Sequence, residues 1–138
     1  MKTWLRSILI LALAGLCFSG YLSAVKLFSG ACAFNESCPY FLGYPACWYG
    51  FAMYLGMFIT SVLAVFSKIS AISTFKINIA ISALGIVFAG SFAWQELLGS
   101  KIIAGALGLS TCAYGLIFYA AISILSVIAL GKSKQALP

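Results

Sequence analysis

The sequence predicts an all-α membrane protein, a bundle of four transmembrane helices with an outer cap segment between the first two. Of its 138 residues, 64% are hydrophobic and only 7% are charged, whereas a soluble domain carries about 25% charged residues. Four apolar stretches have the roughly 20 residues that a helix needs to cross a bilayer core. Because backbone groups in hydrocarbon must be satisfied internally, these stretches are expected to be helices rather than open strands.

The whole chain, residues 1–138, is predicted to be a single domain. Its expected spans are Trp4–Leu27, Ala46–Phe66, Ile77–Trp94 and Ile102–Leu130. The first stretch also resembles a signal peptide, because Lys2 and Arg6 precede an apolar run. That run continues past Tyr21 without a small-residue cleavage site, so we interpret it as a retained helix.

The distribution of lysine and arginine predicts the orientation in the membrane. If the chain crosses four times, most of its basic residues fall on one side: Lys2, Arg6, Lys68, Lys76, Lys132 and Lys134. By the positive-inside rule this side is cytoplasmic, with both termini inside. We therefore expect a multi-pass protein in contact with membrane lipid, in the plasma membrane of a prokaryote. The net charge of +6 is a topology signal, and nucleic acid is not an expected partner because no basic face is interleaved with aromatic residues.

Two cysteines in the expected spans fall at the same depth, near the outer surface. Cys112 precedes Lys132 by 20 residues, which is about 30 Å of helix. Cys47 precedes Lys68 by 21 residues, which is about 31 Å. Both positions are therefore predicted at the outer boundary, far from the basic side.

The other cysteines divide between the outer segment and the bilayer interior. Cys32 and Cys38 lie between the first two spans, in residues 29–45, where glycine and proline interrupt any continuous helix. We expect them to form a disulfide, or Cys38 to be linked to Cys112 in a fraction of molecules. Cys17 lies about 16 Å into the first span, and we interpret it as an apolar packing residue.

A cluster of thiols at an oxidising surface indicates dithiol–disulfide chemistry. Exchange requires an accessible thiolate that attacks a disulfide sulfur. The start of a helix favours the thiolate through its partial positive charge, and Cys47 falls in such a first turn. Cys112 gains the same advantage if the fourth helix begins near Ser110 and Thr111, whose hydroxyls can cap a helix. A metal site is not expected, since the chain has no histidine and lacks the Cys-x2-Cys spacing of most zinc sites.

The sequence resembles the vitamin K epoxide reductase family in two short motifs and in topology along nearly the whole chain. The first motif is the Cys32-x5-Cys38 pair followed by Gly43-Tyr-Pro45 and Gly50. The second is Cys112-Ala-Tyr-Gly115 in the fourth span, which matches the Cys-x-x-Cys centre that opens the family's fourth helix beside a quinone pocket. The resemblance implies that electrons pass from a thioredoxin-like thiol partner on the outer face, through the loop pair, to Cys112 and on to a quinone.

The chain departs from the family at position 115, where glycine replaces the cysteine nearest the quinone. The resemblance alone then leaves the path to the quinone interrupted, unless Cys47 substitutes for the missing thiol. The residues expected to line the quinone pocket are Trp48, Tyr114, Gly115 and Tyr119. Aromatic rings at this depth also commonly form an interface belt or core.

Two functions remain open on the sequence. The first is a membrane thiol–disulfide oxidoreductase with Cys32, Cys38, Cys47 and Cys112 as its catalytic residues and a quinone as electron acceptor. The alternative is a non-catalytic protein on the same scaffold, with one structural disulfide and a binding or assembly role. The glycine at position 115 favours the alternative, and the clustered cysteines favour the enzyme.

Overall fold

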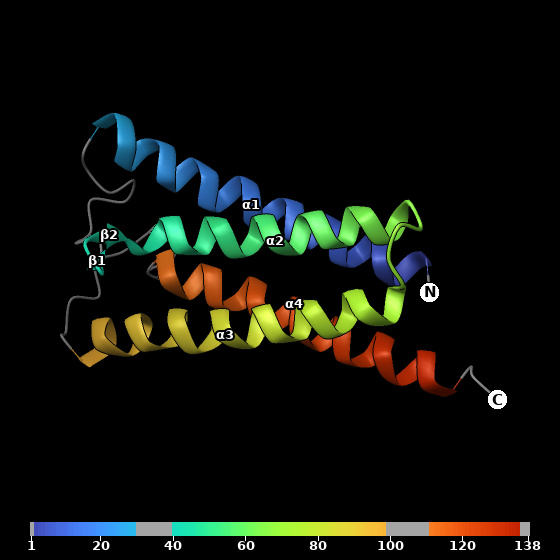
Figure 1. Cartoon of the computed structure of the whole chain (residues 1–138). Coiled ribbons are helices and arrows are strands. Elements are labelled where there is room, and N and C mark those ends of the chain that lie inside the picture. Colours follow the sequence, from blue (N-terminus) through green and yellow to red (C-terminus); the bar gives the residue numbers. More distant parts are fainter. Residues whose placement is uncertain (1, 30–39, 99–110, 136–138) are drawn as a thin grey trace.

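The computed structural model describes residues 2–29, 40–98 and 111–135, and it contains a bundle of four long helices (Figure 1). They are α1 (Lys2–Ser29), α2 (Ala46–Val65), α3 (Ala71–Leu98) and α4 (Thr111–Gln135). All four are long and apolar enough to cross a membrane. The predicted fold class is confirmed, and large apolar side chains such as Ile10, Leu84, Val87 and Ile124 cover the outside of the bundle, where lipid contacts a membrane protein.

The third helix begins earlier than predicted. It starts at Ala71 rather than Ile77, because Ser70 caps it: the Ser73 N–H donates to the Ser70 hydroxyl at 3.2 Å, and the Thr74 N–H donates to the Ser70 carbonyl at 3.1 Å. A serine cap of this kind satisfies backbone donors that have no partner in the helix. Hydropathy placed the start after Lys76, which in fact lies within the helix.

The fourth helix also differs from its predicted limits. Within the described residues it begins at Thr111 and continues to Gln135, five residues beyond the predicted end at Leu130. Lys132 and Lys134 lie in its last turn, where positive charge interacts favourably with the helix dipole. A polar helix end can thus extend out of the hydrocarbon. Residues 102–110 of the predicted span lie outside the described residues.

A short β-hairpin leads directly into α2. Its strands β1 (Tyr40–Phe41) and β2 (Tyr44–Pro45) are antiparallel, with Tyr40 opposite Pro45 and Phe41 opposite Tyr44. The two turn residues, Leu42 and Gly43, both have positive φ, 51° and 84°. Two-residue hairpins prefer such turns because their twist matches that of the strands. The rest of the predicted cap, residues 30–39 with Cys32 and Cys38, lies outside the described residues.

The two ends of the bundle carry different parts of the chain (Figure 1). The start of α1, the link between α2 and α3, and the end of α4 lie at one end, here called the basic end. The hairpin and the starts of α2 and α4 lie at the opposite end, here called the hairpin end. The most extensive contacts join α1 to α2 and α3 to α4, so the bundle consists of two helical pairs placed side by side.

Burial repeats from one helical pair to the other. Positions 5, 8, 12, 15 and 19 of α1 are buried, and so are the positions 70 residues further on, in α3. Positions 54, 57, 61 and 64 of α2 are buried, and so are the positions 65 residues further on, in α4. The two pairs therefore present equivalent faces to the interior.

The amino-acid sequence repeats in the same registers. Residues 47–54 are Cys-Trp-Tyr-Gly-Phe-Ala-Met-Tyr, and residues 112–119 are Cys-Ala-Tyr-Gly-Leu-Ile-Phe-Tyr. Residues 15–20 are Gly-Leu-Cys-Phe-Ser-Gly, and residues 85–90 are Gly-Ile-Val-Phe-Ala-Gly. The chain is thus built from two copies of one two-helix unit, a relation that comparing the sequence with itself would have found.

Candidate functional site

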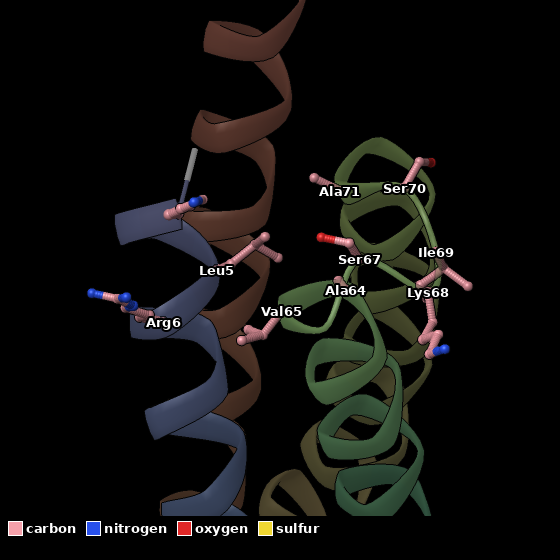
Figure 2. Close-up of a pocket in the computed structure, with 10 residues that line it drawn as sticks. Leu5, Arg6, Ala64, Val65, Ser67, Lys68, Ile69, Ser70 and Ala71 are labelled. Atoms are coloured by element: carbon pink, nitrogen blue, oxygen red, sulfur yellow. The ribbon is translucent and has the colours of Figure 1, made fainter.

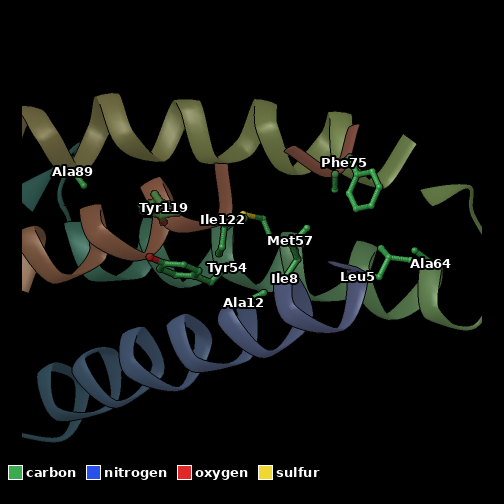
Figure 3. Close-up of a cluster of buried hydrophobic side chains, with 11 residues drawn as sticks. Leu5, Ile8, Ala12, Tyr54, Met57, Ala64, Phe75, Ala89, Tyr119 and Ile122 are labelled. Atoms are coloured by element: carbon green, nitrogen blue, oxygen red, sulfur yellow. The ribbon is translucent and has the colours of Figure 1, made fainter. Parts of the chain in front are cut away.

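Two stacked tyrosines occupy the centre of the bundle. Tyr54 of α2 and Tyr119 of α4 are each only 2% exposed. Their ring centroids are 4.5 Å apart and the ring planes differ by 6°. In Figure 3 they lie within the cluster of buried side chains, near Ala12 and Ile122. We call this pair, with the two glycines that it contacts through its hydroxyls, the tyrosine clasp.

The hydroxyl groups of the clasp are bonded reciprocally. Tyr54 donates to the carbonyl of Gly115 at 2.9 Å, and Tyr119 donates to the carbonyl of Gly50 at 3.4 Å. In α4, Gly115 precedes Tyr119 by four residues, and in α2, Gly50 precedes Tyr54 by four residues. Each tyrosine therefore bonds the glycine one turn before the other tyrosine. A helix carbonyl has a second lone pair beyond its intrahelical bond, so it can accept the hydroxyl as well. Both buried phenols therefore have partners, as the membrane interior demands.

Two further glycines make room for the tyrosine rings. A Cβ at Gly15 of α1 would lie 2.6 Å from Cδ1 of Tyr54, and a Cβ at Gly85 of α3 would lie 2.6 Å from Cε1 of Tyr119. Neither separation can be tolerated without movement of a buried, stacked ring. Each glycine therefore lets its helix approach the tyrosine of its own helical pair, in the small-residue packing typical of membrane helices.

A second pair of aromatic contacts follows the same duplication. Phe18 of α1 meets Tyr114 of α4 edge-on at 5.9 Å, and the equivalent residues, Phe88 of α3 and Tyr49 of α2, meet at 5.6 Å. These contacts run between the helical pairs rather than within them. The clasp and its aromatic neighbours thus join all four helices at the level of Gly50 and Gly115.

Cys47 and Cys112 occupy equivalent positions at the hairpin end. Cys47 lies in the first turn of α2 and Cys112 in the first turn of α4. Each precedes its clasp tyrosine by seven residues, about two helical turns. The predicted common depth of these two positions agrees with this arrangement, and Cys32 and Cys38 lie outside the described residues.

Cys17 is not packed in the interior as expected. It lies on α1 between the buried positions Gly15 and Ser19, but it is itself exposed on the outside of the bundle and unbonded. Depth along a helix was predictable from residue counting, whereas the face of the helix was not, because nearly every neighbouring residue is apolar.

Of the four residues predicted to line a quinone pocket, Tyr114, Gly115 and Tyr119 lie on α4 at the level of the clasp, and Trp48 lies on α2. Tyr119 is engaged in the clasp, Gly115 contributes its carbonyl to it, and Tyr114 packs against Phe18. Trp48 is 37% exposed and packs near Tyr44, with ring centroids 5.8 Å apart. It lines an apolar groove of about 330 Å³ between α1 and α2, formed with Ser23, Ala24, Leu27, Phe28 and Phe51.

The duplication gives Gly115 a role that the family resemblance did not suggest. When residues 112–115 are compared with a Cys-x-x-Cys centre, Gly115 stands where the second cysteine would be. When the two halves of the chain are compared, Gly115 is the counterpart of Gly50, and the carbonyl of each glycine accepts a hydrogen bond from a tyrosine hydroxyl. A Cβ at Gly115 would meet nothing within 4 Å, so the absence of a side chain there is not a packing requirement.

A buried polar network near the basic end breaks the duplication. Asn78 of α3 is fully buried and donates from Nδ2 to the hydroxyl of Ser61 at 3.2 Å. Thr60 donates to Oδ1 of Asn78, also at 3.2 Å. The position equivalent to Asn78 in α1 is the apolar Ile8. The network therefore joins α2 specifically to α3, and sequence reasoning missed it because a single asparagine in an apolar span gives no sign of its partners.

The fold and the clasp define a polytopic helical membrane protein with a parallel internal duplication. Comparison with protein-family models, with curated proteins and with solved structures found no match to this chain.

Proposed function

We propose that this protein is a membrane thiol–disulfide oxidoreductase of the vitamin K epoxide reductase type, in which Cys47 and Cys112 form the membrane-embedded thiol pair. The observation that carries the proposal is the duplicated Cys-x-Tyr-Gly-x3-Tyr sequence, which gives each half one cysteine in the first turn of its second helix. Cys47 then supplies the second thiol that the family motif lacks at Gly115. Helix starts favour thiolates, and both cysteines have this position.

The electrons would pass in three balanced exchanges. A dithiol of an external partner reduces a Cys32–Cys38 disulfide, so that the partner leaves as a disulfide and the loop pair becomes two thiols. The loop thiols then reduce a Cys47–Cys112 disulfide and regain their own bond. Finally, the Cys47 and Cys112 thiols give two electrons and two protons to a quinone, which leaves as a quinol.

A quinone would find the groove beside Trp48 chemically suitable. The groove is lined almost entirely by apolar and aromatic side chains, and its volume of about 330 Å³ falls in the range of small-molecule sites. Trp48 directly follows Cys47 in α2. This groove supports a quinone better than the clasp does, because the clasp hydroxyls already have partners.

The orientation proposed for the chain places the basic end in the cytoplasm and the hairpin end outside, in the plasma membrane of a prokaryote. Lys2, Arg6, Lys68, Lys132 and Lys134 all belong to segments at the basic end, which supports this orientation by the positive-inside rule. The cysteines would then meet an oxidising compartment, where disulfides persist.

The proposal is tested with purified protein that has been reduced and then exposed to a soluble quinone analogue. We expect quinone-dependent oxidation of a thioredoxin-like dithiol to be lost in Cys47→Ser and in Cys112→Ser. Cys17→Ser is the matched control, because it replaces an exposed thiol on a different helix, α1. This variant should retain the activity. Mass spectrometry of non-reduced, alkylated protein should find Cys47 and Cys112 protected after quinone treatment.

The second candidate is the non-catalytic protein, favoured by one observation. Gly115 and Tyr119 belong to a structural clasp, so the likeness of 112–119 to a redox centre has an alternative explanation in packing. Full alkylation of Cys47 and Cys112 after quinone treatment, with no dithiol oxidation by the unsubstituted protein, would establish this second function instead.

A further inference from the structure

We propose that the basic end contains a binding site for the phosphate group of an anionic phospholipid. The site is a cavity of about 630 Å³ between the first turns of α1 and the link that joins α2 to α3. Its lining comes from Lys2, Leu5, Arg6, Ala64, Val65, Ser67, Lys68, Ile69, Ser70 and Ala71. This site is separate from the cysteines, and it does not depend on the proposed redox function.

The polar part of the cavity is suited to an anion. Three of the lining residues, Lys2, Arg6 and Lys68, are cationic and exposed, and no lining residue is acidic. In Figure 2, Arg6 and Lys68 lie on opposite sides of the cavity with their charged ends directed outward, and Ser67 directs its hydroxyl toward α1. Cations from two separate segments thus lie at the outer edges of one space, where their long, exposed side chains can turn toward a phosphate and donate hydrogen bonds to it.

The apolar part of the cavity favours a lipid over a free anion. Leu5 and Ala64 are buried, and Val65 lies between α1 and α2 in Figure 2. These side chains belong to the ends of two membrane-spanning helices, so the cavity is at the level where phospholipid headgroups meet hydrocarbon. Basic pockets between membrane helices at this level bind the headgroups of anionic lipids.

The cavity also distinguishes the two halves of the chain. Lys76 of α3 is the counterpart of Arg6, 70 residues further on. In the first half, however, α2 continues through the link Phe66–Ser70, whose residues Ser67 to Ser70 form one wall of the cavity. The second helical pair supplies no lining residue apart from Ala71. One site is therefore expected for each chain, despite the duplication.

The test is native mass spectrometry of the full-length protein in detergent, titrated with phosphatidylglycerol or with phosphatidylcholine of the same chain length. The cavity variant is Lys2→Gln/Arg6→Gln/Lys68→Gln. The control variant is Lys76→Gln/Lys132→Gln/Lys134→Gln. It also removes three positive charges, but from lysines that do not line the cavity. Since each basic residue near an anionic lipid contributes about a fivefold effect, the apparent Kd for phosphatidylglycerol should rise by about tenfold or more in the cavity variant only.

Several outcomes decide the matter. A charge-conserving variant, Lys2→Arg/Arg6→Lys/Lys68→Arg, should bind within about threefold of the unsubstituted protein, which separates loss of charge from loss of folding. Equal weakening in the cavity and control variants would overturn the site in favour of general surface attraction. Equal binding of phosphatidylcholine, or displacement of the lipid by inorganic phosphate at the lipid's own concentration, would also overturn it, the latter in favour of a free-phosphate site.

Discussion

Individual glycines decide how closely the helices of each pair approach. Gly15 and Gly85 occupy the same place in the two halves, and each faces a buried tyrosine ring that leaves no space for a methyl group. Because the rings are stacked on each other, neither can turn away without breaking the clasp. A methyl group at either position must therefore separate the helices or distort the centre of the bundle.

We expect Gly15→Ala and Gly85→Ala each to lower the free energy of unfolding by about 1–3 kcal/mol, the usual cost of overpacking. Gly131→Ala, where an added Cβ meets nothing within 4 Å, is the matched control and should not destabilise the protein. Unfolding by a denaturing detergent in mixed micelles, followed by circular dichroism, measures the difference. Equal stability of all three variants would contradict the packing described.

The two clasp hydroxyls should contribute unequally. The Tyr54 hydroxyl donates to the Gly115 carbonyl at 2.9 Å, whereas the Tyr119 hydroxyl donates to the Gly50 carbonyl at 3.4 Å, a longer and therefore weaker bond. Tyr54→Phe should therefore destabilise the bundle more than Tyr119→Phe, with about 0.5–1.5 kcal/mol expected for the stronger bond. The exposed Tyr21 provides the control variant, Tyr21→Phe, in the same unfolding measurement. A larger effect for Tyr119→Phe would show that the two bonds rank in the opposite order.

At the scale of elements, the polar network distinguishes the α2–α3 contact from its counterpart between α1 and α4. Asn78 bonds both Thr60 and Ser61. Among the described residues, the α1–α4 contact has no equivalent network, because Ile8 of α1 stands at the position equivalent to Asn78. Hydrogen bonds between membrane helices average about 0.6 kcal/mol and reach about 1.7 kcal/mol. The network is thus a modest contribution to stability and a specific one to helix pairing.

Asn78→Ala should reduce the free energy of unfolding by about 1–2 kcal/mol, since it removes two such bonds and leaves a small gap. Ser91→Ala is its control on α3, because Ser91 is exposed and bonds only the Val87 carbonyl of its own helix. Cysteine crosslinking between α2 and α3, compared in the two variants, reports on helix pairing independently of stability. Unchanged stability in Asn78→Ala would assign the pairing to apolar packing alone.

At the scale of the whole molecule, the two helical pairs should assemble even when their link is cut. Residues 1–68 and 69–138, produced as separate chains in one host, are expected to co-purify, because the clasp and the Asn78 network both cross between the pairs. Tyr54→Ala together with Asn78→Ala should abolish this association. Exposed Tyr21→Ala combined with Ser91→Ala is the matched control. Failure of the unsubstituted halves to associate would mean that the link is needed for assembly.

Much of the molecule's outline could be predicted from the sequence, and its interior could not. Apolar length gave four spans, and residue counting gave the common depth of Cys47 and Cys112, because both depend only on the regular rise of a helix. The start of α3 was missed because a serine cap, not hydropathy, determines it. The exposure of Cys17 and the partners of Asn78 depend on which face of each helix turns inward, and uniformly apolar helices give little sign of that face.

The parallel duplication has a consequence for the ancestry of this protein. Each two-helix unit crosses the membrane twice and returns to its starting side, so two copies can be fused end to end without either one reversing its orientation or its charge bias. An ancestral gene encoding a single unit would have produced a chain of about half this length, which buried its tyrosine only by pairing with a second copy. Descendants of that unfused gene would be small homodimers, each subunit contributing one tyrosine, one accepting glycine and one cysteine. Searches for distant relatives should therefore use residues 1–68 and 71–138 as separate queries.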